Sequence, residues 1–431
     1  MRTLLRMLAV GTVLTVGATV VASSAAPPAD EVSSWNQLLF RAALINATSP
    51  LVITRTTAIV QTAVFDAANG VDGRYTPIHV APAAPAGTSR DAAAMQAAYA
   101  TLVQLYPAQK GLFDARRAVS LTAIGTHDSS TAIANGIAWG QTVADQILAW
   151  RSTDGFTPAP PAFVGGTAVG MWRPTPPAFA SGAGPQFAYM TPWVMSAPSQ
   201  FRPAGPPALN SDQYTTDFNE TQLMGNLTST ARTTDETISS WFWASGTASY
   251  LWNHLALRLL DESHGNKHDS RRNATVEHAR LLALLDLAMA DAAIGCWEAK
   301  YTYVFWRPIT AIPLADTDDN PATAADPTWQ PLFATPAHPE YPSGHSCVSG
   351  AAAAVLADQF GEHTRFQMTS DAMPGVARSF NNFTDAINEV QDARIFAGIH
   401  FRSATRDGQT LGASVAELVL ETEAQPVVRR H

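Results

Sequence analysis

The sequence predicts an all-α fold, a large helical bundle decorated by long loops rich in proline and glycine. Apolar residues recur at helical spacing along most of the chain, and neither a convincing strand pattern nor an internal repeat is found. The 431 residues are 46% hydrophobic and only 15% charged. This is the composition of a globular protein with enough length for a sizeable buried core.

The first 26 residues are typical of a secretory signal peptide. Arg2 and Arg6 form a basic start, about fifteen apolar or small residues follow, and 22–26 offers small residues for cleavage. No later segment has the roughly 18 apolar residues of a membrane span. We therefore expect export to the periplasm or the extracellular space without stable membrane association, with an uncleaved N-terminal anchor as the alternative.

Losing these two arginines takes the formal charge of the chain from −9 to −11. An acidic protein is a poor partner for nucleic acid or for an anionic membrane surface. If it binds an anion, it must do so at a local basic site. The sequence leaves an oligomeric state open.

Residues 27–255 are predicted to form an N-terminal helical region. Ala-rich stretches at 51–75, 90–107 and 129–152 have helical spacing, and the first is expected to stop at Gly70. Between about 154 and 207 the chain is dense in proline, glycine and aromatic residues, which indicates an ordered but irregular loop or lid. Helical patterns resume at 235–246 and 250–263.

Residues 256–431 are predicted to form a catalytic helical region packed with the preceding half as one unit. A long helix over 273–306 is expected to end at Arg307-Pro308, because proline disfavours helical backbone in the residue before it. A second Pro-rich loop, 313–342, follows. The remaining expected helices span 346–360, about 384–397 and about 409–422, with a break at Gly398.

Lys300 is one of only three lysines, and it lies seven residues before Arg307 in an aromatic-rich segment. On a helix this spacing places both side chains on one face. The segment suggests burial, and buried cations need an anion. The alternative is a solvated basic edge.

Two further short motifs bear histidines. Ser343, Gly344 and His345 stand at an expected helix N-terminus, where free N–H groups and the helix dipole favour an anion; the alternative is a serine cap beside an exposed histidine. Arg394 and His400 are six residues apart, so they share a target only if the helix ends between them. Otherwise they are a surface arginine and a helix-end histidine.

Together the motifs read K-x6-RP, PSGH and R-x5-H. In this order and spacing they resemble the superfamily of vanadium-dependent haloperoxidases and type 2 phosphatidic acid phosphatases (PAP2), in particular its secreted bacterial haloperoxidase-like branch. The resemblance implies that Lys300, Arg307 and Arg394 donate to the oxygens of vanadate or phosphate. Ser343 and the Gly344 N–H would complete this oxyanion cradle.

The resemblance also assigns the two histidines. It implies that His400 bonds the vanadium through a ring nitrogen, or is the nucleophile that becomes phospho-histidine in a phosphatase. His345 would be the general acid–base group. The two activities share one site because vanadate mimics the transition state of phosphoryl transfer.

The last motif departs from the family pattern S-R-x5-H-x3-D. Ala393 stands in place of the serine and Ala404 in place of the aspartate that supports the histidine. Asp407, three residues later, is a candidate replacement. For the acidic partner of His345 the candidates are Asp235 and Glu236, which are described with it below.

Three neighbouring residues complete the candidate site. The resemblance associates the position of His338, seven residues before His345, with phenylalanine in chloride-oxidising and histidine in bromide-oxidising members; the alternative is a loop histidine without a halide role. Cys296 lies one helical turn before Lys300, and Cys347 lies two residues after His345. A disulfide between them is expected if the site assembles in this way.

The predicted function is therefore that of an exported vanadate-dependent enzyme that oxidises halide, bromide or iodide in preference, with hydrogen peroxide. A small organic acceptor would be its final substrate. One alternative is an acid phosphatase that hydrolyses phosphomonoesters through a phospho-histidine. The other, motivated by Ala404, is a catalytically weak oxyanion-binding homologue.

Overall fold

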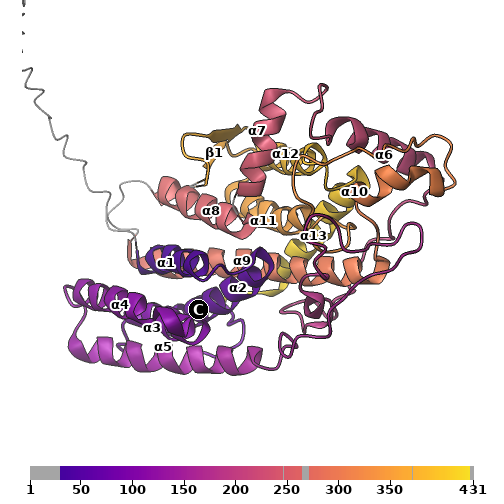
Figure 1. Cartoon of the computed structure of the whole chain (residues 1–431). Helices are drawn as coiled ribbons and strands as arrows, with labels where there is room; N and C mark the ends of the chain where they lie inside the picture. Colours follow the sequence, from indigo (N-terminus) through magenta and orange to yellow (C-terminus); the bar gives the residue numbers. More distant parts are fainter. Residues whose placement is uncertain (1–29, 246, 265–270, 371, 428–431) are drawn as a thin grey trace, which may run out of the picture.

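The computed structural model describes residues 30–427 except 246, 265–270 and 371. The predicted signal peptide lies outside the described residues. Within the described part, no helix combines the length and the apolar character needed to cross a membrane. The predicted all-α class is confirmed, since helices carry the whole architecture (Figure 1).

The helices of the first half lie in two adjoining layers (Figure 1). Their bounds are α1 (Glu31–Ile45), α2 (Pro50–Asp72), α3 (Arg90–Leu105), α4 (Lys110–Ile124) and α5 (Ser130–Arg151). The second half adds α6 (Asp212–Met224), α7 (Thr234–Ser245), α8 (Ala248–His264), α9 (Arg271–Tyr303), α10 (Pro308–Ala311), α11 (Gly344–Phe360), α12 (Phe383–Phe396) and α13 (Arg402–Thr422). The division of the chain near residue 255 stays a prediction.

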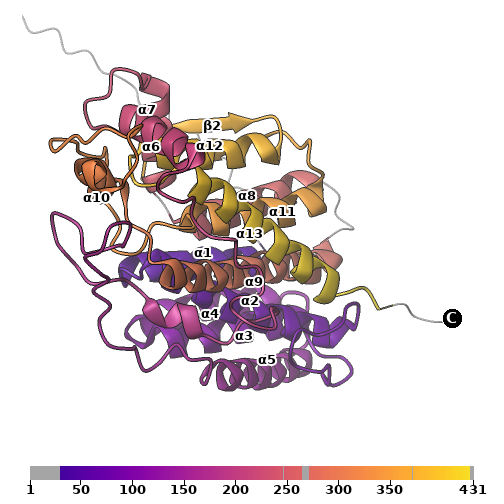
Figure 2. The ribbon, with the colours of Figure 1, turned by 90° about the vertical axis from the view of Figure 1, so that its right-hand side faces the viewer.

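Helix α9 is the centre of the molecule. It lies between α2 on one side and α11 and α13 on the other, and α3 and α5 pack behind α2 (Figures 1 and 2). Every residue from 281 to 300 is buried. A helix that is covered all round has no polar stripe, which is why its sequence is rich in alanine and leucine on every face.

Close packing of α11 against α13 brings two of the sequence motifs together. A methyl group added at Gly412 would lie 2.0 Å from the carbonyl oxygen of Cys347, and one at Gly408 would lie 2.8 Å from that of Ser343. Only glycine permits this approach of one backbone to the other. The start of α11 is therefore held directly against α13.

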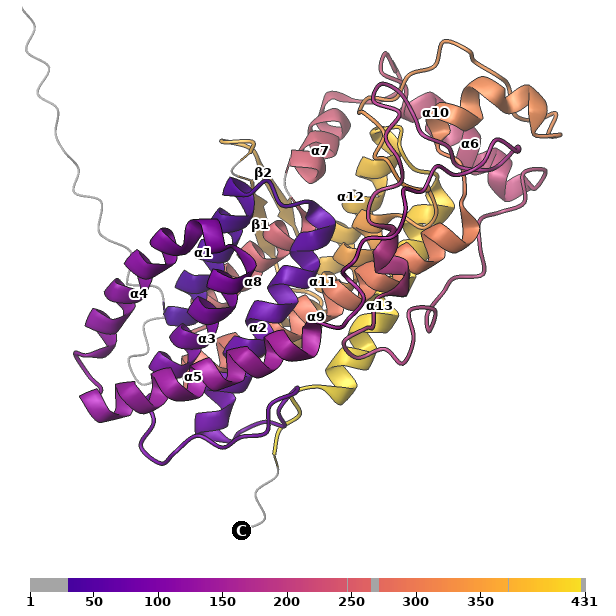
Figure 3. The same cartoon turned by 60° about the horizontal axis from the view of Figure 1, so that its bottom comes forward.

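The loop over 154–207 is irregular, as predicted, apart from one short 3-10 turn at Pro185–Tyr189. It lies along the end of the bundle that also carries α6 and α10 (Figure 3). The buried carboxylate of Asp291 anchors it by accepting hydrogen bonds from the N–H groups of Trp193, Val194 and Met195 at 2.7, 2.8 and 2.9 Å. An irregular loop can be ordered in this way because its backbone donors are satisfied by a side chain.

Several expected boundaries were wrong. Helix α2 runs through Gly70 and ends at Gly73, which has a left-handed φ of 60°. Gly70 serves close packing instead, since an added methyl group would lie 2.5 Å from the ring of Trp139. Helix α13 begins at Arg402, earlier than expected, and α6 was not predicted at all.

The structure also contains a small antiparallel sheet that the sequence did not indicate. Strands β1 (Phe366–Thr369) and β2 (Ala377–Phe380) pair with Phe366 opposite Phe380. Each strand has four residues, too few for an alternating pattern to be recognised. The hairpin lies above α8 and α11 and does not alter the helical class (Figure 1).

Candidate active site

The predicted site residues come from five separate points of the chain and meet at one end of α9. Lys300 lies in the last turn of α9, Arg307 directly precedes α10, and Arg394 lies in the last turn of α12. Ser343 occupies the N-cap of α11, and His400 lies in the link between α12 and α13. All five side chains are buried, while His345 in the first turn of α11 is half-buried.

Lys300 and Arg307 do not share a helical face, which corrects the prediction. Helix α9 ends at Tyr303, and Val304 has a positive φ of 50°, so the chain turns before Arg307. The two cations nevertheless lie near each other. Because they are close, the positive charge of Arg307 helps to lower the pKa of Lys300. The turn after α9 brings the two side chains together, as a shared helical face was expected to do.

The ammonium of Lys300 is bound to the loop that precedes α11. It donates hydrogen bonds to the carbonyl oxygens of Pro339 and Glu340, both at 2.9 Å, and to that of Pro342. Burial lowers its pKa from 10.5 to about 8. Lys300 therefore fixes the course of this loop and supplies positive charge beside it.

Arg307 connects the two histidines of the pocket. Its Nη1 lies 3.1 Å from Nε2 of His400 and its Nη2 lies 3.0 Å from Nδ1 of His338. Burial lowers the pKa of Arg307 to about 10, which leaves it charged at neutral pH. A guanidinium has no acceptor, so Nε2 of His400 must present its lone pair and the ring proton must reside on Nδ1.

That Nδ1–H has a carboxylate partner that the sequence interpretation missed. Oε1 of Glu340 lies 2.8 Å from Nδ1 of His400, and the same oxygen accepts the N–H of Phe401 at 2.9 Å. Both side chains are almost fully buried. Burial raises the pKa of Glu340 to about 7, although Arg307 opposes the shift. The available signal was an acidic residue inside HPEYPSGH, directly before the PSGH motif.

Asp407, the candidate replacement for the motif aspartate, does not approach His400. Its carboxylate accepts the hydroxyl of Tyr341 at 2.6 Å and pairs with Arg406 at 2.9 Å. Ala404 contributes its carbonyl oxygen, which accepts the N–H of Ser343 at 2.9 Å. The carboxylate at His400 therefore comes from the loop before α11 and not from α13.

Unpaired donors converge on the same pocket. In the described part of the chain, the Ser343 hydroxyl and the Nε and Nη1 atoms of Arg394 are buried without a hydrogen-bond partner. Ser343 makes no capping bond, so a mere helix cap does not explain it. Each unsatisfied buried donor costs about 1–3 kcal/mol. With the free N–H groups at the start of α11, this donor set fits a tetrahedral oxyanion such as vanadate or phosphate.

The break between Arg394 and His400 forms as predicted. Helix α12 ends at Phe396, and Gly398 has a φ of 74°. An added methyl group there would lie 2.4 Å from the carbonyl oxygen of Gly225, so the turn needs glycine. It allows the arginine and the histidine to face one pocket.

His345 has no carboxylate partner in the described part of the chain, and both candidates were wrong. Asp235 pairs with Arg378 at 2.6 Å, and Glu236 accepts the N–H of Thr233 at the start of α7. The ring of His345 lies near the main chain of Trp243 instead. Burial and the charge of Arg394 hold its pKa well below the usual 6.5, so the imidazole is neutral at neutral pH.

The expected disulfide is not formed. Cys296 and Cys347 are buried free thiols that lie close enough to affect each other's pKa. The Cys296 sulfur also lies 3.7 Å from the carbonyl oxygen of Pro342. The proximity that motivated the prediction is therefore present, without the covalent bond.

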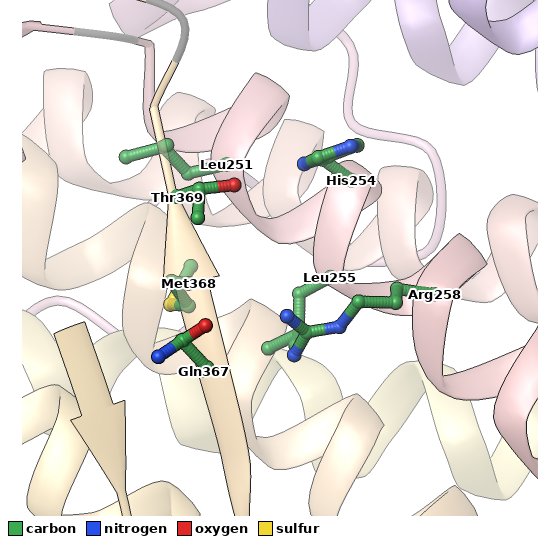
Figure 4. A pocket seen from close by; sticks show the side chains of 7 residues that line it. All are labelled: Leu251, His254, Leu255, Arg258, Gln367, Met368 and Thr369. Atoms are coloured by element: carbon green, nitrogen blue, oxygen red, sulfur yellow. The ribbon is translucent and has the colours of Figure 1, made fainter. Parts of the chain in front are cut away.

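The hollows on the surface lie away from this pocket. One of about 10 Å³ lies between α8 and β1 (Figure 4) and is lined by Leu251, His254, Leu255, Arg258, Gln367, Met368 and Thr369. Its volume holds at most about one water molecule. A larger hollow of about 350 Å³ lies at the turn between β1 and β2, lined by Thr369, Ser370 and residues 374–377. Neither contains a residue of the candidate site.

Comparisons with known proteins agree with this geometry. Residues 280–428 match the family model described as the VCPO second helical-bundle domain, and this range contains all the motif residues. The vanadium chloroperoxidase of Curvularia inaequalis is 31% identical over 175 residues, which are 34% of this chain and 28% of that protein. These matches confirm the resemblance to the vanadium-dependent haloperoxidases over the part of the chain that carries the motifs.

Solved structures of vanadium haloperoxidases extend the similarity over most of the chain. A bacterial vanadium-dependent iodoperoxidase superposes with a TM-score of 0.78 and 25% identity, covering 93% of this chain and 98% of that one. A bacterial vanadium-dependent chloroperoxidase in its apo form has a TM-score of 0.66 and 15% identity, over 86% and 92% of the two chains. The latter shows the shared haloperoxidase fold. The aligned stretch of the fungal chloroperoxidase spans little more than a quarter of its length.

Proposed function

We propose that this protein is a vanadate-dependent haloperoxidase that oxidises halide with hydrogen peroxide. The observation that carries the proposal is the set of buried donors without partners, on Ser343 and Arg394, close to His400, whose unprotonated Nε2 lies 3.1 Å from Arg307. Vanadate held there would act as a Lewis acid that activates peroxide without changing its own redox state. A small organic acceptor would receive the oxidised halogen.

Each residue of the pocket has a defined task in this proposal. His400 would be the ligand of the vanadium, and Arg307 and Glu340 orient its ring. Arg394, Ser343 and the first N–H groups of α11 would hold the oxygens by charge-assisted hydrogen bonds. His345, neutral at rest, would accept and return the proton that peroxide loses.

We further propose bromide or iodide as the preferred halide. The ring of His338 lies on the pocket wall, 5.0 Å from the ring of Trp297, with its Nδ1 3.0 Å from Arg307. The imidazole of His338 makes this part of the site more polar than a phenylalanine side chain would. The similarity to an iodoperoxidase supports this choice, whereas the fungal relative is named a chloroperoxidase.

Export is proposed from the N-terminal segment alone. Its basic start, apolar stretch and small residues are those of a signal peptide. Detection of the processed chain outside the cytoplasm, with its N-terminus mapped by mass spectrometry, would test this proposal. Retention of residues 1–26 in a membrane fraction would contradict it.

The same lone pair of His400 would suit a phosphatase, since a phospho-histidine forms by attack of an unprotonated ring nitrogen. This is the second candidate function. The donor set does not discriminate between phosphate and vanadate, because the two oxyanions have the same tetrahedral shape. An assay must therefore decide.

The test compares purified protein with and without orthovanadate for peroxide-dependent bromination and for hydrolysis of a phosphomonoester. We expect bromination that requires vanadate and is lost in His400→Ala. The matched control is His127→Ala, which removes an exposed histidine. Hydrolysis that vanadate inhibits would establish the phosphatase instead, and inactivity in both assays would leave an oxyanion-binding protein.

A further inference from the structure

We propose that Glu340 is the positioning residue of the site, taking over at His400 the task that the family motif gives to an aspartate at the position of Ala404. Together with Arg307, which donates to Nε2, it holds the ring proton of His400 on Nδ1 and so keeps Nε2 unprotonated. The effect of this positioning on vanadate binding rests on the proposed function. The orientation of the His400 ring by Glu340 does not depend on that function.

The carboxylate of Glu340 accepts hydrogen bonds from both His400 and the next residue, Phe401. Oε1 accepts the Nδ1–H of His400 at 2.8 Å and the backbone N–H of Phe401 at 2.9 Å. Phe401 is the N-cap of α13. One oxygen therefore fixes both the orientation of the ring and the backbone that carries it.

The main chain of Glu340 is itself held from two sides. Its N–H donates to the carbonyl oxygen of Phe305 at 2.9 Å, and its own carbonyl oxygen accepts from Lys300 at 2.9 Å. Support of this kind preorganises a residue that must orient another one. It also gives Lys300 a role that a direct contact with the oxyanion would not explain.

The surroundings of position 404 show why the carboxylate is elsewhere. Ala404 is fully buried in an apolar cluster that includes Tyr214, Phe218, Trp306 and Phe401. A carboxylate introduced among these rings would lose most of its hydration. Glu340 reaches His400 from the loop before α11, where Arg307 and Lys300 provide positive charge.

Glu340 also adjusts the charge of the pocket. Lys300, Arg307 and Arg394 are three buried cations, and Glu340 is the carboxylate that acts on the first two, which leaves a formal excess of two positive charges. Such an excess attracts an oxyanion without leaving all three cations uncompensated in the absence of one.

The test measures which ring nitrogen of His400 carries the proton, in protein without vanadate or peroxide. The chain is labelled with ¹⁵N-histidine, and the His400 signal is assigned by its loss in His400→Ala. We expect the wild type to show the Nδ1–H tautomer by its ¹⁵N shifts. Glu340→Gln, whose amide oxygen can still accept both hydrogen bonds, should retain this tautomer. Glu340→Ala leaves only the contact of Arg307 with Nε2 to select it, so its ¹⁵N shifts should move towards those of a mixture of tautomers.

Binding of orthovanadate, measured by titration calorimetry, gives a second readout. Glu340→Ala should weaken it by about 10- to 100-fold, the usual loss when the partner of a metal-binding histidine is removed. Asp407→Asn is the matched control, because it removes the nearby alternative carboxylate but keeps an acceptor for Tyr341. It should leave both readouts unchanged.

The inference is overturned if wild-type His400 carries its proton on Nε2, or if Glu340→Ala leaves the Nδ1–H tautomer intact. An Asp407→Asn variant that loses the tautomer would transfer the role to Asp407. None of these outcomes depends on halide oxidation. Failure of the haloperoxidase assay with an intact Nδ1–H tautomer would therefore refute the proposed function and leave the role of Glu340 standing.

Discussion

Replacing Arg394 by methionine should make the protein more stable without ligand and unable to gain stability from vanadate. Methionine has a similar length and no charge, so it removes the buried cation and its two unpaired donors. The variant would avoid the cost of burying this charge, and its site would no longer bind an oxyanion. Stability and function oppose each other at this residue because a preorganised anion site carries uncompensated charge when empty.

The magnitude follows from the burial of the guanidinium. Burial, helped by Arg307, lowers the pKa of Arg394 from 12.5 to about 9. At about 1.4 kcal/mol per pKa unit, this sets an upper limit of about 5 kcal/mol on the cost of the charge. Two unsatisfied donors alone give a lower figure of about 2 kcal/mol. We expect Arg394→Met to raise the free energy of unfolding by roughly 2 kcal/mol, since part of the gain is lost to imperfect packing.

The assay is denaturant unfolding with and without orthovanadate. A ligand at 100 times its dissociation constant stabilises the wild type by about 2.7 kcal/mol, so the order of the two proteins should reverse when vanadate is added. Arg365→Met, at an exposed arginine, is the control and should change neither value by more than about 0.5 kcal/mol. The reasoning is refuted if Arg394→Met is less stable without vanadate, or if vanadate still stabilises it.

Three further changes test other parts of the structure. His338→Phe should raise the rate of chloride relative to bromide oxidation by roughly tenfold, about 1.4 kcal/mol, measured by steady-state kinetics; an unchanged ratio would remove the halide role of His338. Asp286 is fully buried with its pKa raised to about 7, so the stability that its neutral form contributes is complete below about pH 4 and is lost as the pH rises through 7. Asp286→Asn should therefore flatten the pH dependence and gain about 3 kcal/mol of unfolding free energy relative to the wild type between pH 5 and pH 8. The same change in unfolding free energy between these pH values in both proteins would contradict this. Gly412→Ala should cost at least about 3 kcal/mol through its clash with Cys347, whereas Gly111→Ala, where nothing lies within 4 Å, should be neutral or stabilising in the same measurement.

Periodicity identified the long helices because each repeats the same burial requirement over many turns. Helices α3, α5, α9 and α12 appear within a few residues of their expected bounds. The four-residue strands offered too few repeats to be recognised, and α6 was missed because its mostly polar sequence carries only four buried residues in 13. The irregular loop over 154–207 was recognised because proline, glycine and aromatic residues together exclude both a helix and a disordered linker.

At the candidate site, too, some features were predicted from the sequence and others were not. The order and spacing of three motifs resembled a known superfamily, and that resemblance placed the three cations, Ser343 and the two histidines at one site before any contact was known. The partners of the histidines were predicted wrongly, because Asp407, Asp235 and Glu236 were chosen by closeness in sequence or by charge alone. Each of them is engaged elsewhere, with Tyr341, Arg378 and the start of α7 respectively.

The sequence by itself determined the helical class and the chemistry of the site, since both are written in local patterns and in residue types at short spacing. Only the tertiary structure decided which carboxylate reaches His400, that the two cysteines stay free, and that the start of α11 lies against α13. These facts depend on the packing of segments that are 50 or more residues apart. A side chain's partner is chosen by the distance between atoms in the folded chain, and no local pattern encodes that distance.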